Sequence, residues 1–238
     1  MGRYSTDPSA LQPSNNTAVQ QNYGSQYCPY SSTMVNANQQ QPQQLQVTPN
    51  IIPAFKPIVA LDLNGVIVED RPLYGSNSIT VIPSALEGIR ILRNKGYRIF
   101  ILSDQPDIQR GVITPSNIDE SFNHLMKIFG ENGIFSIDGF LYNTSDLKED
   151  MYAKPNLGMV KRAETEIFKD KVKFKDGWYI GDSLVDLKFA EKMKAVPVLI
   201  KTGNYEQTLT KLETFSNKDL KNKTKIYNNL VEFANSLE

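Results

Sequence analysis

Short apolar runs alternate with segments of helical spacing from residue 57 to the end of the chain. Apolar runs bounded by Gly, Pro or charged residues are typical of strands that are buried on both faces. They predict strands at 57–63, 97–103, 140–143, 177–182 and 195–203. Apolar residues three or four positions apart predict helices, several of which begin next to a proline. These helices are expected at 83–96, 114–130, 154–168, 183–193, 205–215 and 225–237.

This order of elements indicates the α/β fold class. Strands that alternate with helices are joined by right-handed crossovers, which build a doubly wound, mainly parallel sheet with helices on both faces. In such sheets, ligands bind beyond the carboxyl ends of the strands. Polar side chains at those ends are therefore the first candidates for function.

Residues 1–53 differ in composition from the rest. They are rich in Gln, Asn, Ser, Pro and Tyr and contain few aliphatic side chains. Such a segment buries too little apolar surface to offset the entropy lost on ordering, so we expect a disordered tail followed by one domain at 54–238. The tail is either a spacer or an element that binds a protein partner or another copy of the chain.

Composition and charge narrow the classes of function. Lys plus Arg and Asp plus Glu each number 26, so the net charge is zero and gives no global attraction to nucleic acid or an anionic membrane. No apolar run approaches the roughly 20 residues of a membrane span, and we expect no secretory signal. Cys28 is the only cysteine, which excludes an intramolecular disulfide and a cysteine-rich zinc site. These features favour a cytoplasmic location.

Polar residues stand where the predicted strands end and helices begin. Asp62 ends the first strand, Ser103 the second and Asp182 the fourth, while Lys154 precedes a helix and Asp186 lies one turn into the next. Each residue alone has a common structural explanation, as a turn former or a first-turn acid. Together, clustered carboxylates call for a cation, and oxygen ligands without His or Cys favour Mg²⁺. A lysine and a hydroxyl beside such a metal suit a phosphate.

Four short motifs in this order resemble the haloacid dehalogenase (HAD) superfamily of phosphotransferases. They are "DLNGV" (62–66), "ILS" (101–103), "KP" (154–155) and "GDSLVD" (181–186). The loop "SDQPDIQRGVIT" (103–114) is similar to that of subfamily III, in the histidinol-phosphate and heptose-bisphosphate phosphatase branch, which polynucleotide 3′-phosphatases share. The resemblance implies an HAD-like Rossmannoid fold without a separate cap domain.

The resemblance also implies roles for individual residues. Asp62 would be the nucleophile that forms an aspartyl-phosphate. Mg²⁺ would be held by Asp62, the backbone carbonyl of Asn64 and Asp182, with Asp186 orienting a metal-bound water or the lysine of the third motif. The expected substrate-binding residues, of which Ser103 and Lys154 also act in catalysis, are Ser103, Asp104, Gln105, Arg110 and Lys154.

The chain departs from the family pattern at several positions. Most HAD phosphatases have a second aspartate where Asn64 stands, and that aspartate protonates the leaving group and then activates water. An amide cannot exchange a proton in this way, and loss of a general acid–base costs about 10²- to 10⁴-fold in rate. The region before Lys154 contains no Cys or His, so we expect no zinc there. Asp104 also replaces a family asparagine, so heptose bisphosphate is not carried over as the substrate.

These observations lead to one main hypothesis and two alternatives. The main hypothesis is an Mg²⁺-dependent phosphomonoester hydrolase that acts on a small phosphorylated metabolite, with a sugar phosphate favoured. The first alternative is a weakened domain that binds a phosphate ligand or a partner, because of Asn64. The second alternative is a polynucleotide 3′-phosphatase, which the open site permits but which no extended basic and aromatic stretch supports.

Overall fold

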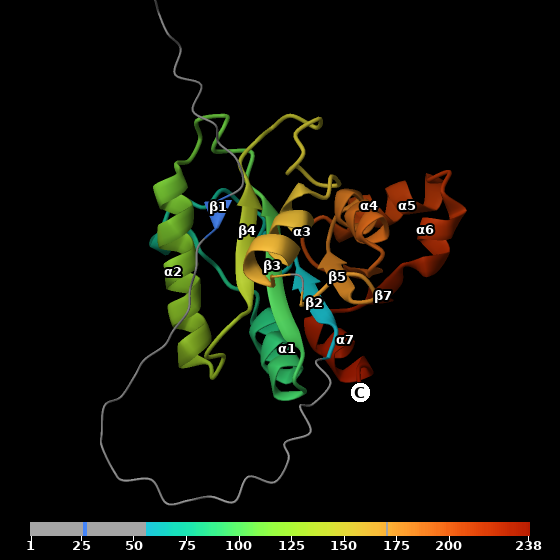
Figure 1. Cartoon of the computed structure of the whole chain (residues 1–238), viewed down its shortest axis with the longest axis horizontal. Helices are drawn as coiled ribbons and strands as arrows, with labels where there is room; N and C mark the ends of the chain where they lie inside the picture. The colour runs from blue at the N-terminus through green and yellow to red at the C-terminus, as the bar shows by residue number, and fades with distance from the viewer. Residues whose placement is uncertain (1–25, 28–55, 170) are drawn as a thin grey trace, which may run out of the picture.

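The computed structural model describes residues 26–27, 56–169 and 171–238 (Figure 1). In this part of the chain the strands form one sheet of order β1-β4-β3-β2-β5-β6-β7, in which β1 is antiparallel to β4 and the other neighbours are parallel. The strands are β1 (Gln26–Tyr27), β2 (Ile58–Leu61), β3 (Arg98–Asp104), β4 (Gly139–Asn143), β5 (Trp178–Gly181), β6 (Val196–Ile200) and β7 (Lys225–Tyr227). The predicted tail lies outside the described residues except for β1.

Helices connect the parallel strands, as the sequence predicts. They are α1 (Pro83–Asn94), α2 (Pro115–Glu131), α3 (Gly158–Arg162), α4 (Leu184–Met193), α5 (Tyr205–Thr214), α6 (Lys218–Lys223) and α7 (Leu230–Ser236). A 3₁₀ turn, η1 (Ser76–Ser78), and a π-helical turn, η2 (Ala163–Ile167), complete the list. Among the described residues, no helix is both long and apolar enough to cross a membrane.

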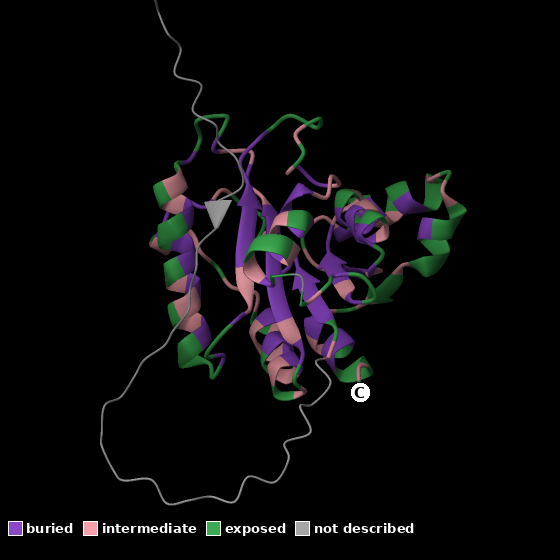
Figure 2. Ribbon diagram, in the orientation of Figure 1, coloured by how far each residue is buried: buried purple, intermediate pink, exposed green. Residues whose placement is uncertain are grey.

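The core lies on both faces of the sheet. Adjacent strand residues point to opposite faces, so Leu61 packs with α1, α2 and α7 on one side, while Ala60 packs with α3 and α4 on the other. Helices α5 and α6 join α4 and β6 in a smaller apolar cluster. Figure 2 shows the buried strands in the centre, with exposed residues on the outer faces of the helices. This arrangement confirms the predicted doubly wound α/β fold.

Two helical predictions were wrong in their bounds. The helix expected at 154–168 begins only at Gly158, because the side chain of Asn156 donates hydrogen bonds to the carbonyls of Lys148 and Asp150 and holds a loop. The helix expected at 225–237 begins at Leu230, and the preceding β7 pairs with β6.

The connection between β2 and α1 forms a flap, here defined as residues 66–82. It contains η1 and isolated bridges from Val68 to Asn64 and to Val81. The described chain therefore carries no separate cap domain at this point. The ends of β2, β3, β4 and β5 meet at the edge of the sheet beside the flap.

Candidate active site

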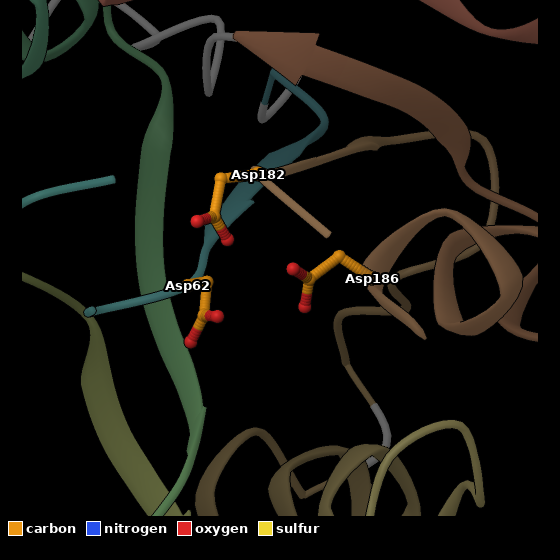
Figure 3. A group of neighbouring side chains, drawn as sticks. All are labelled: Asp62, Asp182 and Asp186. Carbon is orange, nitrogen blue, oxygen red and sulfur yellow. The ribbon is translucent and has the colours of Figure 1, made fainter. Parts of the chain in front are cut away.

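Three buried acids meet at the carboxyl ends of two neighbouring strands. Asp62 directly follows β2, Asp182 directly follows β5, and Asp186 lies in the first turn of α4. One carboxylate oxygen from each of the three residues lies within 4.8 Å of the other two. Figure 3 shows their carboxylates turned toward a shared space. The structure therefore brings together the three acids that the sequence singled out.

Lys154 lies among these acids and is itself buried. Its Nζ is 3.0 Å from Asp62 Oδ2 and 2.7 Å from Asp186 Oδ1, and it donates a 3.2 Å hydrogen bond to the hydroxyl of Tyr179. The three protons of the ammonium group thus have three acceptors. Burial alone would lower the pKa of Lys154, but Asp186 and Asp62 together raise it well above its usual value. Lys154 therefore stays charged beside Asp62.

The charge around Asp62 is not fully offset by Lys154. Burial raises the pKa of Asp62 well above its usual value, Lys154 lowers it in part, and Asp186 and Asp182 raise it further. Burial and the charge of Asp186 also raise the pKa of Asp182 to about 6. Three carboxylates with one lysine leave an excess of buried negative charge, which a cation would neutralise.

Asp186 accepts hydrogen bonds from Ser183 as well as from Lys154. Ser183 caps α4, and both its backbone N–H and its hydroxyl donate to Asp186 Oδ2, at 3.1 and 2.5 Å. This capping box fixes the carboxylate so that Oδ1 faces Lys154. The contacts of Asp186 therefore fit its expected role, which is to orient Lys154.

The loop after β6 supports Asp182. The backbone N–H of Asn204 donates to Asp182 Oδ2 at 2.6 Å and its side-chain amide donates to the same atom at 3.1 Å. Thr202 donates a 2.5 Å hydrogen bond to the carbonyl of Gly65, which joins this loop to the one after β2. The sequence predicts a strand over 195–203 here but gives no role to Asn204, whose only signal is its place directly after that predicted strand.

Two glycines allow these loops to approach Asp182 closely. Gly65 and Gly203 have φ angles of +77° and +51°, which favour glycine. A Cβ atom built on Gly65 would lie 2.2 Å from Asp182 Oδ2, and one built on Gly203 would lie 2.1 Å from it. Both positions therefore require glycine for space as well as for backbone conformation.

A chain of amide hydrogen bonds links the ends of β2 and β3. The side-chain amide of Gln105 donates to Ser103 Oγ at 3.0 Å and to Asn64 Oδ1 at 2.7 Å. Ser103 and Gln105 are buried. Because Ser103 Oγ accepts from Gln105, its own proton remains available for a different acceptor.

Asp104 and Arg110 have protein partners of their own. Asp104 accepts hydrogen bonds from the backbone N–H of Lys154 and from Asn143, and burial raises its pKa. Arg110 is half exposed and donates to both carboxylate oxygens of Asp146, at 3.0 and 2.5 Å. Asp104 thus holds the loop that carries Lys154, while Arg110 keeps a fixed direction at the mouth of the site.

A cavity of about 410 Å³ opens above Asp62 and Asp182. Its walls come from the flap, the loop after β3 and the loop after β6. Of the predicted site residues, those that line it are Asp62, Asn64, Asp104, Arg110, Lys154 and Asp182. Sequence reasoning missed other residues in its walls, namely Asp70, Arg71, Asp107, Ser183 and Asn204.

The donor set fits Mg²⁺. Asp62 and Asp182 offer carboxylate oxygens to one space, and the surplus negative charge there calls for a cation. Hard oxygen ligands without His or Cys are those that Mg²⁺ prefers. The residues present would therefore hold this ion.

Comparison with known proteins identifies the family. The model of the polynucleotide kinase 3 phosphatase family matches residues 58–221, which is more than half of the chain. The chain belongs to this family. The match spans the sheet from β2 through α6 and includes the three acids and Lys154.

Curated relatives are named heptose bisphosphate phosphatases. The D-glycero-D-manno-heptose-1,7-bisphosphate 7-phosphatase of Chlorobaculum tepidum is 27% identical over 164 residues, which cover 64% of this chain and 82% of that protein. The corresponding enzyme of Neisseria meningitidis serogroup A is 25% identical over 180 residues, covering 74% and 92%.

Solved structures share the fold. The D,D-heptose 1,7-bisphosphate phosphatase of B. bronchiseptica, complexed with magnesium and phosphate, matches with a TM-score of 0.66 at 20% identity, covering 76% of this chain and 97% of that one. The enzyme of Burkholderia thailandensis matches with a TM-score of 0.55 at 22% identity, with the same coverage. Together with the family match, these relatives confirm the prediction of an HAD-type, subfamily III-like phosphatase.

Proposed function

We propose that this protein is an Mg²⁺-dependent phosphomonoester hydrolase that acts on a small phosphorylated metabolite, a sugar phosphate, through an aspartyl-phosphate at Asp62. The observation that carries the proposal is the buried cluster of Asp62, Lys154, Asp182 and Asp186, of which the first three line a cavity of about 410 Å³. A cavity of this size suits a small ligand. The named activity of the curated relatives supports a sugar phosphate.

In this proposal Asp62 and Lys154 act as a pair. A carboxylate oxygen of Asp62 attacks phosphorus, the ester P–O bond breaks, and the leaving oxygen takes a proton from solvent. Water then attacks phosphorus, the P–O bond to Asp62 breaks, and phosphate is released while the proton of the water passes to solvent. Lys154, 3.0 Å from Asp62, stabilises negative charge shared between the nucleophile and the transferred group. Ser103, whose hydroxyl accepts from Gln105, donates its proton to a phosphate oxygen. Bound Mg²⁺, held by Asp62, Asp182 and the carbonyl of Asn64, would offset charge on the phosphoryl group.

The remaining predicted substrate-binding residues either contact a phosphate of the substrate or hold the residues that do. Arg110 presents a planar group suited to bidentate contact with a phosphate, and Asp146 fixes its direction. Gln105 contributes by holding Ser103, and Asp104 by holding the backbone of Lys154. The same proposal places the enzyme in the cytoplasm, where phosphorylated metabolites are formed.

Phosphate release from a panel of sugar phosphates, with and without Mg²⁺, tests the proposal. Wild type and Asp62→Asn are compared side by side. Release that needs both Mg²⁺ and Asp62 supports it. Release that is equal in both proteins contradicts it, because the nucleophile would then be elsewhere.

A polynucleotide 3′-phosphate is the second candidate substrate. It is favoured by the description of the matching family and by a site without a separate cap domain. An oligonucleotide that carries a 3′-phosphate belongs in the same panel. If it is cleaved with a kcat/KM higher than that of every sugar phosphate, this second candidate replaces the first.

A further inference from the structure

The amide of Asn64 is held on both sides. Its Oδ1 accepts a 2.7 Å hydrogen bond from Gln105, and its Nδ2 donates a 2.9 Å hydrogen bond to the backbone carbonyl of Arg71 in the flap. Gln105 is in turn fixed, because its backbone N–H donates to Asn143 and its side chain is buried. Position 64 therefore presents a fixed carboxamide beside the site, and a carboxamide neither gives nor takes a proton in catalysis.

The other acids that line the cavity are engaged by donors. Asp104 accepts from the backbone of Lys154, Asp107 from Arg110, and both Asp70 and Asp182 from Asn204. Each of these bonds occupies an acceptor site of the carboxylate and holds it toward a neighbouring protein group. Within the described wall of this cavity there is no histidine.

From these contacts, and resting on the proposed function, we infer that, when the leaving group departs without needing a proton, the phosphoryl group stays on Asp62 long enough for the phosphorylated enzyme to accumulate. In the first step an Asp62 oxygen bonds to phosphorus and the ester P–O bond breaks. In the second step a water oxygen bonds to phosphorus, the P–O bond to Asp62 breaks, and the water proton passes to bulk solvent. Without a general base the second step is slower by about 10²- to 10⁴-fold.

The two steps differ in what they need from position 64. The first step needs a proton only when the leaving group is a poor one, because an aryl phosphate releases a stabilised phenolate anion. The second step always needs to remove a proton from water. An aryl phosphate should therefore phosphorylate Asp62 quickly and leave it phosphorylated.

Rapid-mixing kinetics with an aryl phosphate and Mg²⁺ test this inference. We compare wild type, Asp62→Asn and Asn64→Asp, following phenolate release and the intact mass of the quenched protein. Wild type should release a burst of one equivalent of phenolate, followed by a slow phase, and should carry one phosphoryl group. Asn64→Asp should lose the burst, and its steady rate should rise by about 10²- to 10⁴-fold.

The outcomes separate this inference from the proposed function. If wild type releases phenolate linearly and carries no phosphoryl group, while Asp62→Asn is inactive, the inferred accumulation is overturned and the proposed function still stands. Release by Asp62→Asn at the wild-type rate overturns both. The wild-type burst is decisive by itself if Asn64→Asp fails to fold. A wild type that releases no phenolate also overturns the inference, because the first step would then be absent.

Discussion

The ammonium group of Lys154 lies 3.0 Å from the carboxylate of Asp62, and both side chains are buried. They come from different parts of the chain: Asp62 directly follows β2, and Lys154 lies in the loop before α3. Lys154 also donates hydrogen bonds to Asp186 and Tyr179, which fix its position beside Asp62. A single lysine thus links the predicted nucleophile to the helix that follows β5.

Replacing Lys154 by methionine should damage both activity and stability. Removing one partner of a buried ion pair leaves the remaining charges uncompensated, which costs about 3–5 kcal/mol. We expect Lys154→Met to lower the free energy of unfolding by that amount and to abolish turnover. Urea denaturation and phosphate release measure the two effects.

Lys161 is the matched control for Lys154, because it is exposed on α3. Lys161→Met should leave both measurements close to wild type. A Lys154→Met variant as stable as wild type would show that the ion pair is not buried in solution.

Mg²⁺ should stabilise the folded protein through Asp182. A ligand that binds only the folded state adds about 2.7 kcal/mol at a concentration 100 times its Kd. For a chain of this length, each kcal/mol raises Tm by about 2–4 °C. We therefore expect added Mg²⁺ to raise Tm in wild type and EDTA to reverse the change, as followed by calorimetry. Asp182→Asn should lose most of the shift, and an equal shift in both proteins would place the ion elsewhere.

The fold was largely predictable because its central strands are apolar runs. Segments with weak hydrophobic patterns were not found. Helix α6 buries only Leu220, so it shows no helical periodicity, and β7 is a three-residue edge strand with mostly exposed residues. Helix α6 packs against α4 and β6, and β7 pairs with β6, and local sequence does not record such contacts.

The floor of the site was more predictable than its walls. Asp62 and Asp182 stand directly after buried strands, and that position is visible in the sequence. Asn204 and Asp70 lie in loops, and only the folded chain brings them into contact, at 2.7 Å. The partner of Arg110, Asp146, is likewise distant in sequence.

Arg110 should affect substrate binding more than stability. Its pair with Asp146 is exposed, and exposed ion pairs contribute little to folding. Loss of a charged, bidentate contact with a phosphate should raise KM by about 10-fold. We expect this rise in Arg110→Ala, with Tm unchanged. Arg90→Ala, which breaks the exposed pair with Glu87 on α1, should change neither quantity. An unchanged KM in Arg110→Ala would remove Arg110 from the substrate site.

Gly203→Ala should weaken Mg²⁺ binding, while Gly133→Ala should not. Both glycines have positive φ angles, +51° and +77°, so alanine at either position costs about 1–2 kcal/mol of backbone strain. The two positions differ in the room that is available for the added methyl group. A Cβ on Gly203 would lie 2.1 Å from Asp182 Oδ2 and 2.8 Å from Gly65 Cα, whereas a Cβ on Gly133 meets nothing within 4 Å.

The comparison therefore separates backbone strain from displacement of Asp182. Both variants should lose similar stability from strain, but only Gly203→Ala has to move Asp182 or the loop after β6. We expect Gly203→Ala to need a much higher Mg²⁺ concentration for half-maximal phosphate release, and Gly133→Ala to match wild type. Equal Mg²⁺ dependence in the two variants would show that close contact with Gly203 does not set the position of Asp182. It would also remove the loop after β6 from the metal site, because Asn204 reaches Asp182 through that same loop.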